Sequence, residues 1–362
     1  MSDEAYLDRL VDEDRLRSYL ADALGPADRL EIERVDEGHS NETLFVTWGE
    51  QDLVVRRPPP GKTADTAHDV LREHRVVSSL QETDVPVPET VLASDDHEVI
   101  GSDFYVMGRL NGDVIRTEES DWLATRDARG RVSTELVDTL AAIHGVDYEA
   151  VGLGEFGYPE GFTQRQVDRW HEQFEWARET TADHRDLPEL ERVTAWLDEH
   201  VPAEHPHTLV HGDYKLDNVM LAPANADGAT DAGDPEVVAV FDWEMATLGD
   251  PFTDLGWMLS FWHDADDPEP PIPDLYPTLT AREGYLTRRE LIDRYEDQTG
   301  FEFDEPRFYV VLAIYKMAAL GEMFFRRHLE GNSDDPLYPR MEDGVSRLFD
   351  EATSLIDGEY EI

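Results

Sequence analysis

The sequence predicts an α+β protein of two lobes, a small lobe built on an antiparallel sheet and a larger, mainly helical lobe. Short runs of β-branched and aromatic residues separated by turns fill the first third of the chain. Helical periodicity dominates the remainder, and the turn at Asn111-Gly112 separates the two patterns. We therefore expect a small lobe over residues 1–110 and a helical lobe over residues 111–362.

The small lobe is expected to begin with one helix over residues 5–24, which Gly25-Pro26 ends. The third β-type run after it stops at Pro58-Pro59-Pro60, because proline cannot donate to a sheet ladder. A helical pattern then precedes two further short strands. The expected strands cover 30–35, 43–48, 53–57, 98–100 and 104–107, and the expected helix covers 64–80.

The large lobe is expected to be helical, with three short β segments. The helices are predicted over 132–144, 163–181, 188–199, 252–263, 287–298, 306–329 and 336–356, and the β segments over 208–210, 219–221 and 237–241. Residues 222–236 are small and acidic without periodicity, which predicts a hairpin loop. The apolar run 310–320 falls short of the ~18 residues of a membrane span and contains Lys316, so we expect a core helix.

The charge balance is extreme. Asp and Glu number 81 against 31 Lys and Arg, which gives a net charge of -50 over 362 residues. Only Lys62, Lys215 and Lys316 are lysines, so the other 28 basic residues are arginines. An acidic surface nearly free of lysine keeps a protein hydrated in concentrated salt, where the self-repulsion is screened. This composition is typical of a haloarchaeal cytoplasmic protein; an acidic protein made for a basic partner would concentrate its charge in a block.

Composition also excludes several classes of function. Nucleic-acid binding is disfavoured, because phosphate contacts need clustered basic residues. The absence of cysteine excludes disulfides, thiol catalysis and cysteine-ligated zinc. The acidic N-terminal segment lacks the basic start and apolar core of a signal peptide. We therefore expect a protein of the cytoplasm that acts on neither membranes nor nucleic acids, with an oligomeric state that the sequence leaves open.

Two polar segments follow short apolar strands in the second half of the chain. The first reads HGDYKLDN from His211 to Asn218, and the second reads FDWE from Phe241 to Glu244, followed by GDP and Asp254. Asp213 and Asn218 are five residues apart, the spacing of the Asp and Asn in a kinase catalytic loop. In such loops the Asp accepts the substrate proton, the Asn binds Mg²⁺, and a later Asp supplies a second metal contact. Hard oxygen ligands of this kind suit Mg²⁺.

Taken together, HGDYKLDN and FDWEMATLGDPFTDL resemble the aminoglycoside phosphotransferase/choline kinase superfamily, a branch of the protein-kinase-like fold. Four earlier segments agree in order: EGHSNETLFV, LVVRRPPPG, REHRVVSSL and FYVMGRLNG. The set is most similar to the kinase-like domain found fused to acyl-CoA dehydrogenases, over residues 30–330. The resemblance implies ATP or GTP in a cleft between two lobes, Mg²⁺, and transfer of the γ-phosphoryl group to a hydroxyl of a metabolite, possible acceptors including a hydroxyacyl-CoA.

The resemblance also implies roles for single residues. Asp213 would orient or deprotonate the acceptor hydroxyl, while Asn218 and Asp242 would hold Mg²⁺. Asp254 would brace the catalytic loop by accepting its backbone N–H groups. The remaining residues implied in nucleotide binding are Ser40 and Asn41 at the phosphates, Arg56 on the third strand with its partner Glu73, and Met107 and Arg109 in the hinge that holds adenine through the backbone.

Two positions depart from the protein-kinase pattern. Arg56 stands where protein kinases have the strand lysine, although arginine can also bridge phosphates and Glu73. Gly108 replaces an acidic hinge residue, which leaves backbone recognition of adenine intact. Arg56 is the basis of an alternative hypothesis, a nucleotide-binding pseudokinase with a regulatory role. A metal-dependent phosphate-ester hydrolase is a third hypothesis, but it explains neither EGHSN nor the pair of Arg56 and Glu73.

Lys215 is singled out by composition as well as by motif. A chain that has nearly lost lysine keeps one of its three inside the eight-residue catalytic segment. We interpret Lys215 as a contact to the γ-phosphate; the alternative is an exposed loop lysine.

Other histidines and aromatic residues carry weaker signals. His205, His207 and His211 do not have the spacing of a zinc site, and His211 is expected to hydrogen-bond to the loop backbone. His144 is expected to be a packed residue at a helix end, and His39 lies in the nucleotide loop. Core packing is the expectation for five large aromatics, with the wall of an acceptor pocket as the alternative: Trp170, Phe174, Trp176, Trp257 and Trp262.

The charge balance generates a prediction about salt. Raising KCl from roughly 0.1 M to 1 M shortens the Debye length from about 10 Å to 3 Å, so repulsion among the surface carboxylates should fall. The melting temperature should therefore rise with KCl, as followed by circular dichroism. A melting temperature that is indifferent to KCl would contradict the halophilic interpretation.

Overall fold

The computed structural model describes residues 3–35, 41–60, 69–203, 205–224, 233–333, 335–359 and 362. It divides into two compact units. The first comprises Met1–Gly112 with two later segments, Val151–Leu153 and Val238–Ala246, and the second comprises the rest of the chain. The predicted division at residue 110 assigned both later segments to the helical lobe.

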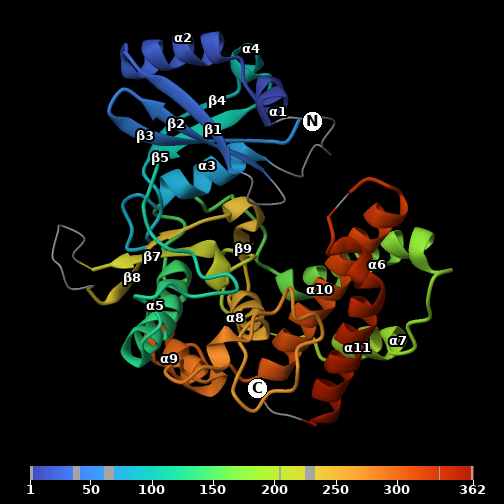
Figure 1. Cartoon of the computed structure of the whole chain (residues 1–362). Helices are drawn as coiled ribbons and strands as arrows, with labels where there is room; N and C mark the ends of the chain where they lie inside the picture. Colours follow the sequence, from blue (N-terminus) through green and yellow to red (C-terminus); the bar gives the residue numbers. More distant parts are fainter. Residues whose placement is uncertain are drawn as a thin grey trace. The chain divides into compact units, whose positions relative to one another are not determined.

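The first unit is built on a five-stranded antiparallel sheet of order β1-β2-β3-β5-β4 (Figure 1). Its strands are β1 (Leu30–Val35), β2 (Glu42–Trp48), β3 (Gln51–Arg57), β4 (Thr90–Ser94) and β5 (Phe104–Gly108). One face packs on α1 (Asp3–Leu10), α2 (Glu13–Leu24) and α4 (His97–Ile100), and the other face packs on α3 (Val70–Ser79).

Strand alternation decides which side chains face α3. Leu53 and Val55 of β3 belong to the core under α1 and α2, whereas Val54 between them packs with α3. Arg56, two residues after Val54, therefore lies on the α3 face. Tyr105 of β5 pairs with Arg56 across the strands and packs on the same side. This register brings a charged side chain and a phenol against one face of α3.

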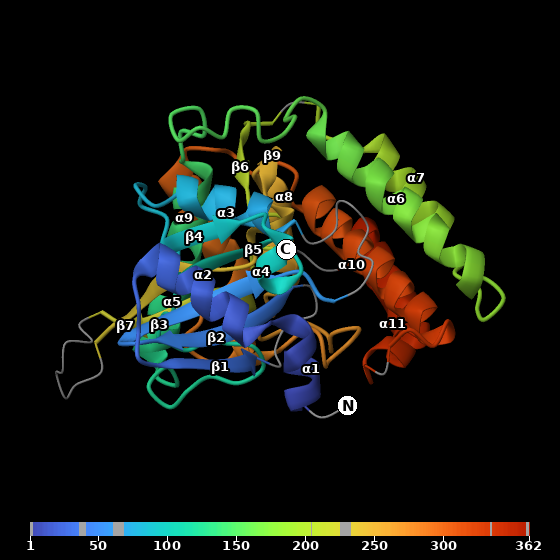
Figure 2. The same cartoon turned by 90° about the horizontal axis from the view of Figure 1, so that it is seen from above.

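The second unit is mainly helical. Figure 2 shows α6 (Phe162–Thr181) beside α7 (Leu190–Glu199), and α10 (Pro306–Leu329) beside α11 (Met341–Asp357). Its other helices are α5 (Arg126–His144), α8 (Phe252–Ser260) and α9 (Arg288–Thr299), and its short strands are β6 (Thr208–Val210), β7 (Val219–Pro223) and β9 (Thr247–Gly249). Strand β6 pairs with β9, and β7 pairs with β8 (Pro235–Val240), within which the chain passes into the first unit.

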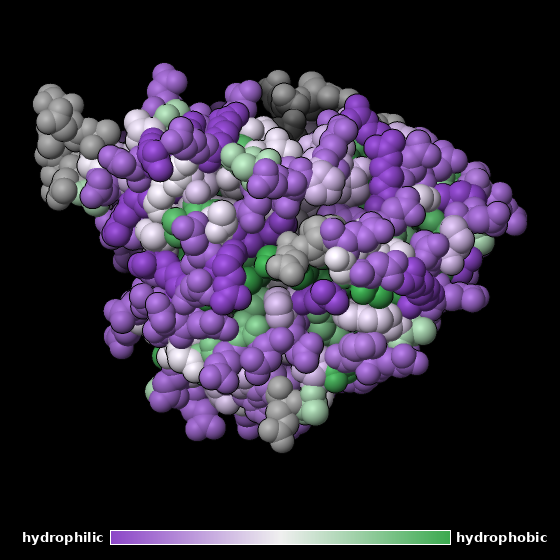
Figure 3. All heavy atoms as spheres, turned by 90° about the horizontal axis from the view of Figure 1, so that it is seen from below, coloured by the Kyte–Doolittle hydropathy of each residue, from purple (hydrophilic) through white to green (hydrophobic). Residues whose placement is uncertain are grey.

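Helix α10 is the core of the second unit. By length and composition it could span a membrane, but 83% of its most apolar 18-residue window is buried inside the protein. The expectation of a core helix here is therefore confirmed. The face of the molecule drawn in Figure 3 is mostly hydrophilic, with small apolar patches between the polar side chains, as a net charge of -50 leads one to expect.

The α+β fold class is confirmed, and several element boundaries are corrected. The predicted helix over 5–24 is two helices, because the Asp12 side chain accepts the N–H of Arg15 and starts α2. The predicted strand over 98–100 is the helix α4, capped by Asp96 and closed by Gly101 with φ +82°. Two strands were missed, β4 after the Val-Pro-Val-Pro segment and the three-residue β9.

The helical boundaries are also shifted by a few residues. The structure starts α3 at Val70, and the predicted residues 64–68 lie outside the described part of the chain. Helix α5 begins at Arg126 rather than at 132, because Thr125 caps it. Residues 338–340 form a short 3₁₀ helix ahead of α11. Residues 225–232 of the predicted hairpin loop are likewise outside the described residues, but β7 and β8 on either side do pair.

Candidate active site

The catalytic segment predicted from HGDYKLDN lies in the second unit, between β6 and β7. Gly212 makes the turn after β6 with φ +85°, a conformation that glycine adopts without strain. The last three residues of the segment, Leu216–Asn218, form a 3₁₀ turn that leads into β7. The sharp turn and the short helix fold Asp213 and Asn218 toward each other.

Asp254, in the first turn of α8, holds the backbone of this segment. Its carboxylate accepts the N–H of His211 at 2.6 Å and the N–H of Gly212 at 2.8 Å. His144, at the end of α5, lies 3.3 Å from the same carboxylate and also contacts the hydroxyl of Tyr295. Burial alone would raise the pKa of Asp254, but the His144 hydrogen bond and the charges of His144 and His211 outweigh it and lower the pKa. The expected bracing role of Asp254 is confirmed.

His211 is part of the same backbone support. Its Nδ1 accepts the N–H of Asp213 at 3.1 Å, as expected for a histidine that bonds to the loop. Among the described residues, no group of three or more His, Cys, Asp or Glu is placed to hold a metal ion. The side chain of His144 is fully buried at the end of α5, as expected.

The carboxylate of Asp213 is held on both oxygens. Oδ1 accepts the indole N–H of Trp257 at 2.8 Å, and Oδ2 accepts Nζ of Lys215 at 3.0 Å and the amide of Asn218 at 2.9 Å. Burial alone would raise the pKa of Asp213, but the charges of Lys215 and Lys316 outweigh it and lower the pKa. Asp213 is therefore an ionised hydrogen-bond acceptor at neutral pH.

Lys215 lies between two carboxylates. Its ammonium is 3.0 Å from Asp213 and 3.0 Å from Asp217, and the side chain is 16% exposed. Although burial alone would lower the pKa of Lys215, these two carboxylates outweigh it and raise the pKa, so the side chain carries a positive charge at neutral pH. The alternative of a free, exposed loop lysine is wrong.

Asn218 uses only one end of its side chain. Its amide nitrogen donates to the carbonyl oxygen of Asp213 at 2.8 Å and to the Asp213 carboxylate. Its carbonyl oxygen has no hydrogen-bond partner among the residues that the structure describes. A hard oxygen in this position fits the coordination chemistry of Mg²⁺.

The second polar cluster lies in the first unit, on the α3 face of the sheet. The guanidinium of Arg56 is 3.1 Å from Glu73 of α3 and 2.7 Å from Asp242, so the predicted pair of Arg56 and Glu73 forms. Burial raises the pKa of Glu73 despite the charge of Arg56. Burial and the neighbouring Glu73 raise the pKa of Tyr105, whose hydroxyl remains neutral beside the pair.

Asp242 follows β8 and adopts a left-handed backbone with φ +63°, unique among the non-glycine residues that the structure describes. Such a conformation is strained for most residues, although Asp tolerates it better than most, and it marks functional positions. Oδ1 accepts the Arg56 hydrogen bond, while Oδ2 has no partner in the described part of the chain. One oxygen is thus oriented by Arg56 and the other is available to a cation.

The nucleotide loop is described only in part. Ser40 and His39 lie outside the described residues. Asn41 is buried just ahead of β2, and its amide donates to Glu244 at 3.2 Å. Its carbonyl oxygen is buried without a hydrogen-bond partner among the described residues. The structure thus joins Asn41 to the FDWE segment.

The predicted hinge residues end β5. The backbone N–H of Gly108 donates to Glu89, and that of Arg109 donates to Asp52 at 2.9 Å. The Arg109 amide is therefore engaged within the sheet, and we leave it out of the nucleotide contacts proposed below. Its guanidinium lies 3.7 Å from the centre of the Phe45 ring instead. Met107 is buried at the α3 face of the strand.

Two residues that contact the catalytic segment were missed by sequence reasoning. Trp257 donates to Asp213, and Lys316 of α10 donates to the carbonyl oxygen of Gly212 at 2.6 Å. Trp257 had been assigned to the core, where its ring does lie. The scarcity of lysine, which drew attention to Lys215, applies equally to Lys316. Trp176, expected in the core, is 49% exposed under the guanidinium of Arg326, which corrects that expectation.

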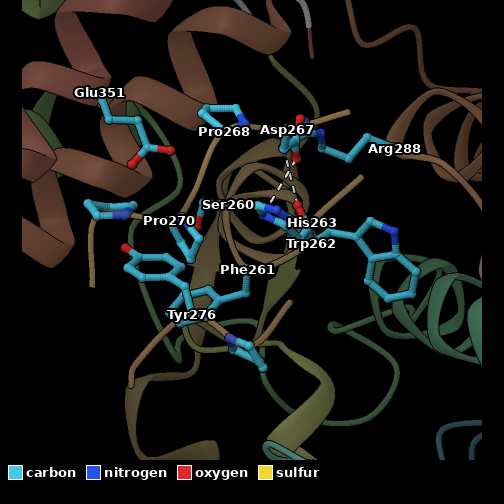
Figure 4. Close-up of a pocket in the computed structure, with 12 residues that line it drawn as sticks. Ser260, Phe261, Trp262, His263, Asp267, Pro268, Pro270, Tyr276, Arg288 and Glu351 are labelled. Carbon is cyan, nitrogen blue, oxygen red and sulfur yellow. Dashed lines mark hydrogen bonds and ion pairs between the residues drawn. The ribbon is translucent and has the colours of Figure 1, made fainter. Parts of the chain in front are cut away.

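A pocket that is partly open to solvent lies beyond the end of α8 (Figure 4). The rings of Phe261 and Tyr276 stack 4.8 Å apart in its wall. The ring of Phe261 also lies 5.0 Å from that of Trp257, which holds Asp213. On the other side, Asp267 forms an ion pair with Arg288 and lies 3.8 Å from the ring nitrogen Nδ1 of His263. One aromatic ring therefore separates this pocket from the catalytic segment.

The fold is that of the small-molecule kinases. The structure superposes on the Plasmodium vivax ethanolamine kinase with a TM-score of 0.61 over 94% of this chain and 87% of that one, at 12% identity. Residues 31–307 match the family described as the phosphotransferase enzyme family. The chain belongs to this family.

Other proteins are similar to this chain at higher sequence identity. Acyl-CoA dehydrogenase family member 10 of Mus musculus is 31% identical over 333 residues, and member 11 of Homo sapiens is 30% identical over 314 residues. These matches cover 89% and 84% of this chain but only 29% and 37% of those proteins. A protein from Ralstonia eutropha, provisionally described as an aminoglycoside phosphotransferase, is 28% identical with a TM-score of 0.77, over 95% of this chain and 99% of that one.

The Asp254 network leads to a stability prediction. Asp254→Asn should lower the free energy of unfolding by about 1–3 kcal/mol at pH 7, because an amide oxygen cannot replace a carboxylate with two buried N–H donors. The folded-state pKa of Asp254 is lowered, so its stabilisation is present above the unfolded pKa near about 4 and is lost as pH falls.

Urea unfolding in high salt at pH 7 and at about pH 3.5 would measure this. The difference in the free energy of unfolding between wild type and Asp254→Asn should be smaller at the lower pH. The exposed control Asp121→Asn should have the wild-type free energy of unfolding at both pH values. An equal difference between wild type and Asp254→Asn at both pH values would argue against a charged Asp254 as the brace.

Proposed function

We propose that the protein is a small-molecule kinase that transfers the γ-phosphoryl group of ATP or GTP to a hydroxyl of a metabolite, with Asp213 as its catalytic carboxylate. The observation that carries the proposal is the environment of Asp213. Its carboxylate is kept ionised and is oriented on both oxygens by Trp257, Lys215 and Asn218. A carboxylate so held can accept a proton from an alcohol placed beside it.

The reaction balances without any further reactant. The hydroxyl oxygen of the acceptor forms a bond to the γ-phosphorus, and the bond from that phosphorus to the bridging oxygen of the nucleoside diphosphate breaks. The hydroxyl proton passes to the carboxylate of Asp213. The products are a phosphate monoester and the nucleoside diphosphate. Lys215 would place its ammonium charge on the transferred group, where negative charge is spread over the equatorial oxygens.

The nucleotide is proposed to bind with Mg²⁺. The free oxygens of Asn218 and Asp242 are the metal ligands that the side chains present fit best. When bound, Mg²⁺ would neutralise charge on the phosphates. Arg56, oriented by Glu73, would contact the phosphates together with Ser40 and Asn41. The backbone at Met107 would face the base.

The acceptor is proposed from the relatives and from the pocket beyond α8. The relatives that match over most of this chain carry acyl-CoA dehydrogenase names, so a hydroxyacyl-CoA is the acceptor we would test first. One wall of the pocket, formed by Phe261 and Tyr276, is aromatic and lies one ring from the Asp213 support. Asp267, Arg288 and Glu351 make the rest of the lining partly polar, so the pocket suits an acceptor with both an apolar and a polar part. We place the enzyme in the cytoplasm on its composition, acting on neither membranes nor nucleic acids.

A second candidate is a nucleotide-binding pseudokinase. One observation favours it: a single nitrogen of Arg56 contacts both Glu73 and Asp242, so the cluster is closed on itself. The complete set of Asp213, Asn218 and Asp242 favours the enzyme. The two candidates differ in turnover, which only the enzyme would show.

Asp213→Asn should lower kcat by about 10²–10⁴-fold, because the amide cannot accept the hydroxyl proton. The affinity for Mg·ATP, measured from the thermal stabilisation that the ligand gives in high KCl, should stay within about twofold of wild type. The matched control is Asp217→Asn, which removes the other carboxylate on Lys215 and should keep most of the turnover. Unchanged turnover in Asp213→Asn would remove this residue from its proposed role.

Asp242→Ala should weaken Mg·ATP binding by about 10–100-fold, because it removes both a metal ligand and a partner of Arg56. Isothermal titration with Mg·ATP and with ATP in EDTA would separate the metal-dependent part. Asp52→Ala, at the exposed start of β3 in the same sheet, is the control. If Mg·ATP affinity does not change in Asp242→Ala, Asp242 is not a metal ligand.

A further inference from the structure

Lys316 is a buried cation in the middle of α10, the core helix of the second unit. The residue is 8% exposed, and the side chains from Phe308 to Ala319 are all buried around it. It is one of only three lysines in the chain. A buried ammonium group loses its hydration, so it is retained only where other groups replace the water.

The groups that replace water at Lys316 belong to the catalytic segment and its support. Nζ donates to the carbonyl oxygen of Gly212 at 2.6 Å and lies 3.6 Å from the centre of the Trp257 ring. The ring of Trp170 on α6 is 5.6 Å away. Within the described residues, no carboxylate lies at ion-pair distance from this ammonium. A cation held only by a carbonyl group and aromatic faces is a poor device for stability alone, because an apolar side chain would avoid the desolvation cost.

Both contacts of Lys316 involve groups that hold Asp213, the preceding residue in the chain and the indole that donates to its carboxylate. Gly212 precedes Asp213 in the chain, and its N–H is held by Asp254 while its carbonyl oxygen is held by Lys316. Trp257 donates its indole N–H to Asp213 Oδ1, and the ammonium lies against that same indole ring. A cation on the ring face polarises the indole and restrains its orientation.

We infer that Lys316 is a positioning residue for the catalytic carboxylate, acting on Asp213 through the Gly212 carbonyl and the Trp257 indole. The inference rests on the proposed kinase function for its meaning in catalysis, but the geometry of the cluster stands without it. Lys316 itself would touch neither substrate nor nucleotide. Its role is to fix the direction of the Asp213 carboxylate.

The charge state of Lys316 gives the inference a pH dependence. Burial lowers the pKa of Lys316 to about 8, although the negative charges of Asp213 and Asp254 act in the opposite direction. Lys215 on the catalytic segment and Arg169 on α6 add to the lowering. The positioning form is the protonated one, so it is present below about pH 8 and is lost above it. Since its folded-state pKa lies below that of a free lysine, the charge does not add to stability at neutral pH.

The test compares Lys316→Met with wild type in high KCl. We expect kcat to fall by about tenfold to a hundredfold while the melting temperature stays equal or rises and Mg·ATP affinity stays within about twofold. Lys316→Arg, which keeps the charge, should recover part of the loss. Trp257→Phe, which keeps a ring but removes the N–H, should show a similar loss, and the double variant should lose less than the product of the two.

The pH profile of kcat separates positioning from simple packing. Wild type should lose activity above about pH 8, and Lys316→Met should lack this limb. If Lys316 served only packing, Lys316→Met should lower the melting temperature along with kcat and should leave the pH profile of kcat as in wild type. That result would overturn the inference. Wild-type kcat in Lys316→Met would also overturn it. If Lys316→Met did not fold, Trp257→Phe and Lys316→Arg would decide by the same criteria.

A readout without turnover keeps this inference distinct from the proposed function. The indole N–H resonance of Trp257, assigned by its loss in Trp257→Phe, should shift in Asp213→Asn and in Lys316→Met. If the wild-type protein shows no turnover but the two substitutions shift the resonance, the kinase proposal is overturned and the positioning geometry stands. A resonance that does not respond to either substitution would overturn the positioning role itself.

Discussion

The second unit depends on one buried carboxylate, that of Asp254. Its position in the first turn of α8 gives it two backbone N–H groups of the loop after β6, and His144 contacts it from α5. Trp257 lies one turn further along α8, on the same side of the helix, and donates to Asp213. A single helical face therefore fixes both the backbone of the catalytic segment and the direction of its carboxylate.

The first unit contains a buried cluster of one cation and two carboxylates. Strand alternation places Arg56 and Tyr105 on the face that packs against α3, where Glu73 would otherwise be a buried carboxylate without a counter-ion. Asp242 shares the guanidinium and keeps one oxygen unengaged. One terminal nitrogen of Arg56 donates to both carboxylates, and the rigid plane of the guanidinium fixes the direction of these hydrogen bonds better than an ammonium would.

The parts of the site that sequence could predict are those encoded in contiguous motifs. Asp213, Lys215 and Asn218 lie within six residues, and the bracing role of Asp254 was implied by the family resemblance of the FDWEMATLGDPFTDL segment. Lys316 acts on Gly212 across 104 positions of chain, so no local pattern could reveal it. The errors in secondary structure have local causes: His97–Ile100 has β-type composition, but the caps at Asp96 and Gly101 make it a helical turn. The prolines just before β4 indicated a loop, so that strand was not predicted.

The discontinuity of the first unit has a consequence for synthesis. The chain leaves this unit at Gly112, returns for Val151–Leu153, and returns again for Val238–Ala246. Arg75 bonds to Gly152, Val240 to Pro86, and Arg56 to Asp242, so each return contributes contacts to the sheet and to α3. A ribosome must therefore release about two thirds of the chain before Arg56 can meet its second carboxylate. Until then, the Arg56 guanidinium would have Glu73 as its single carboxylate partner.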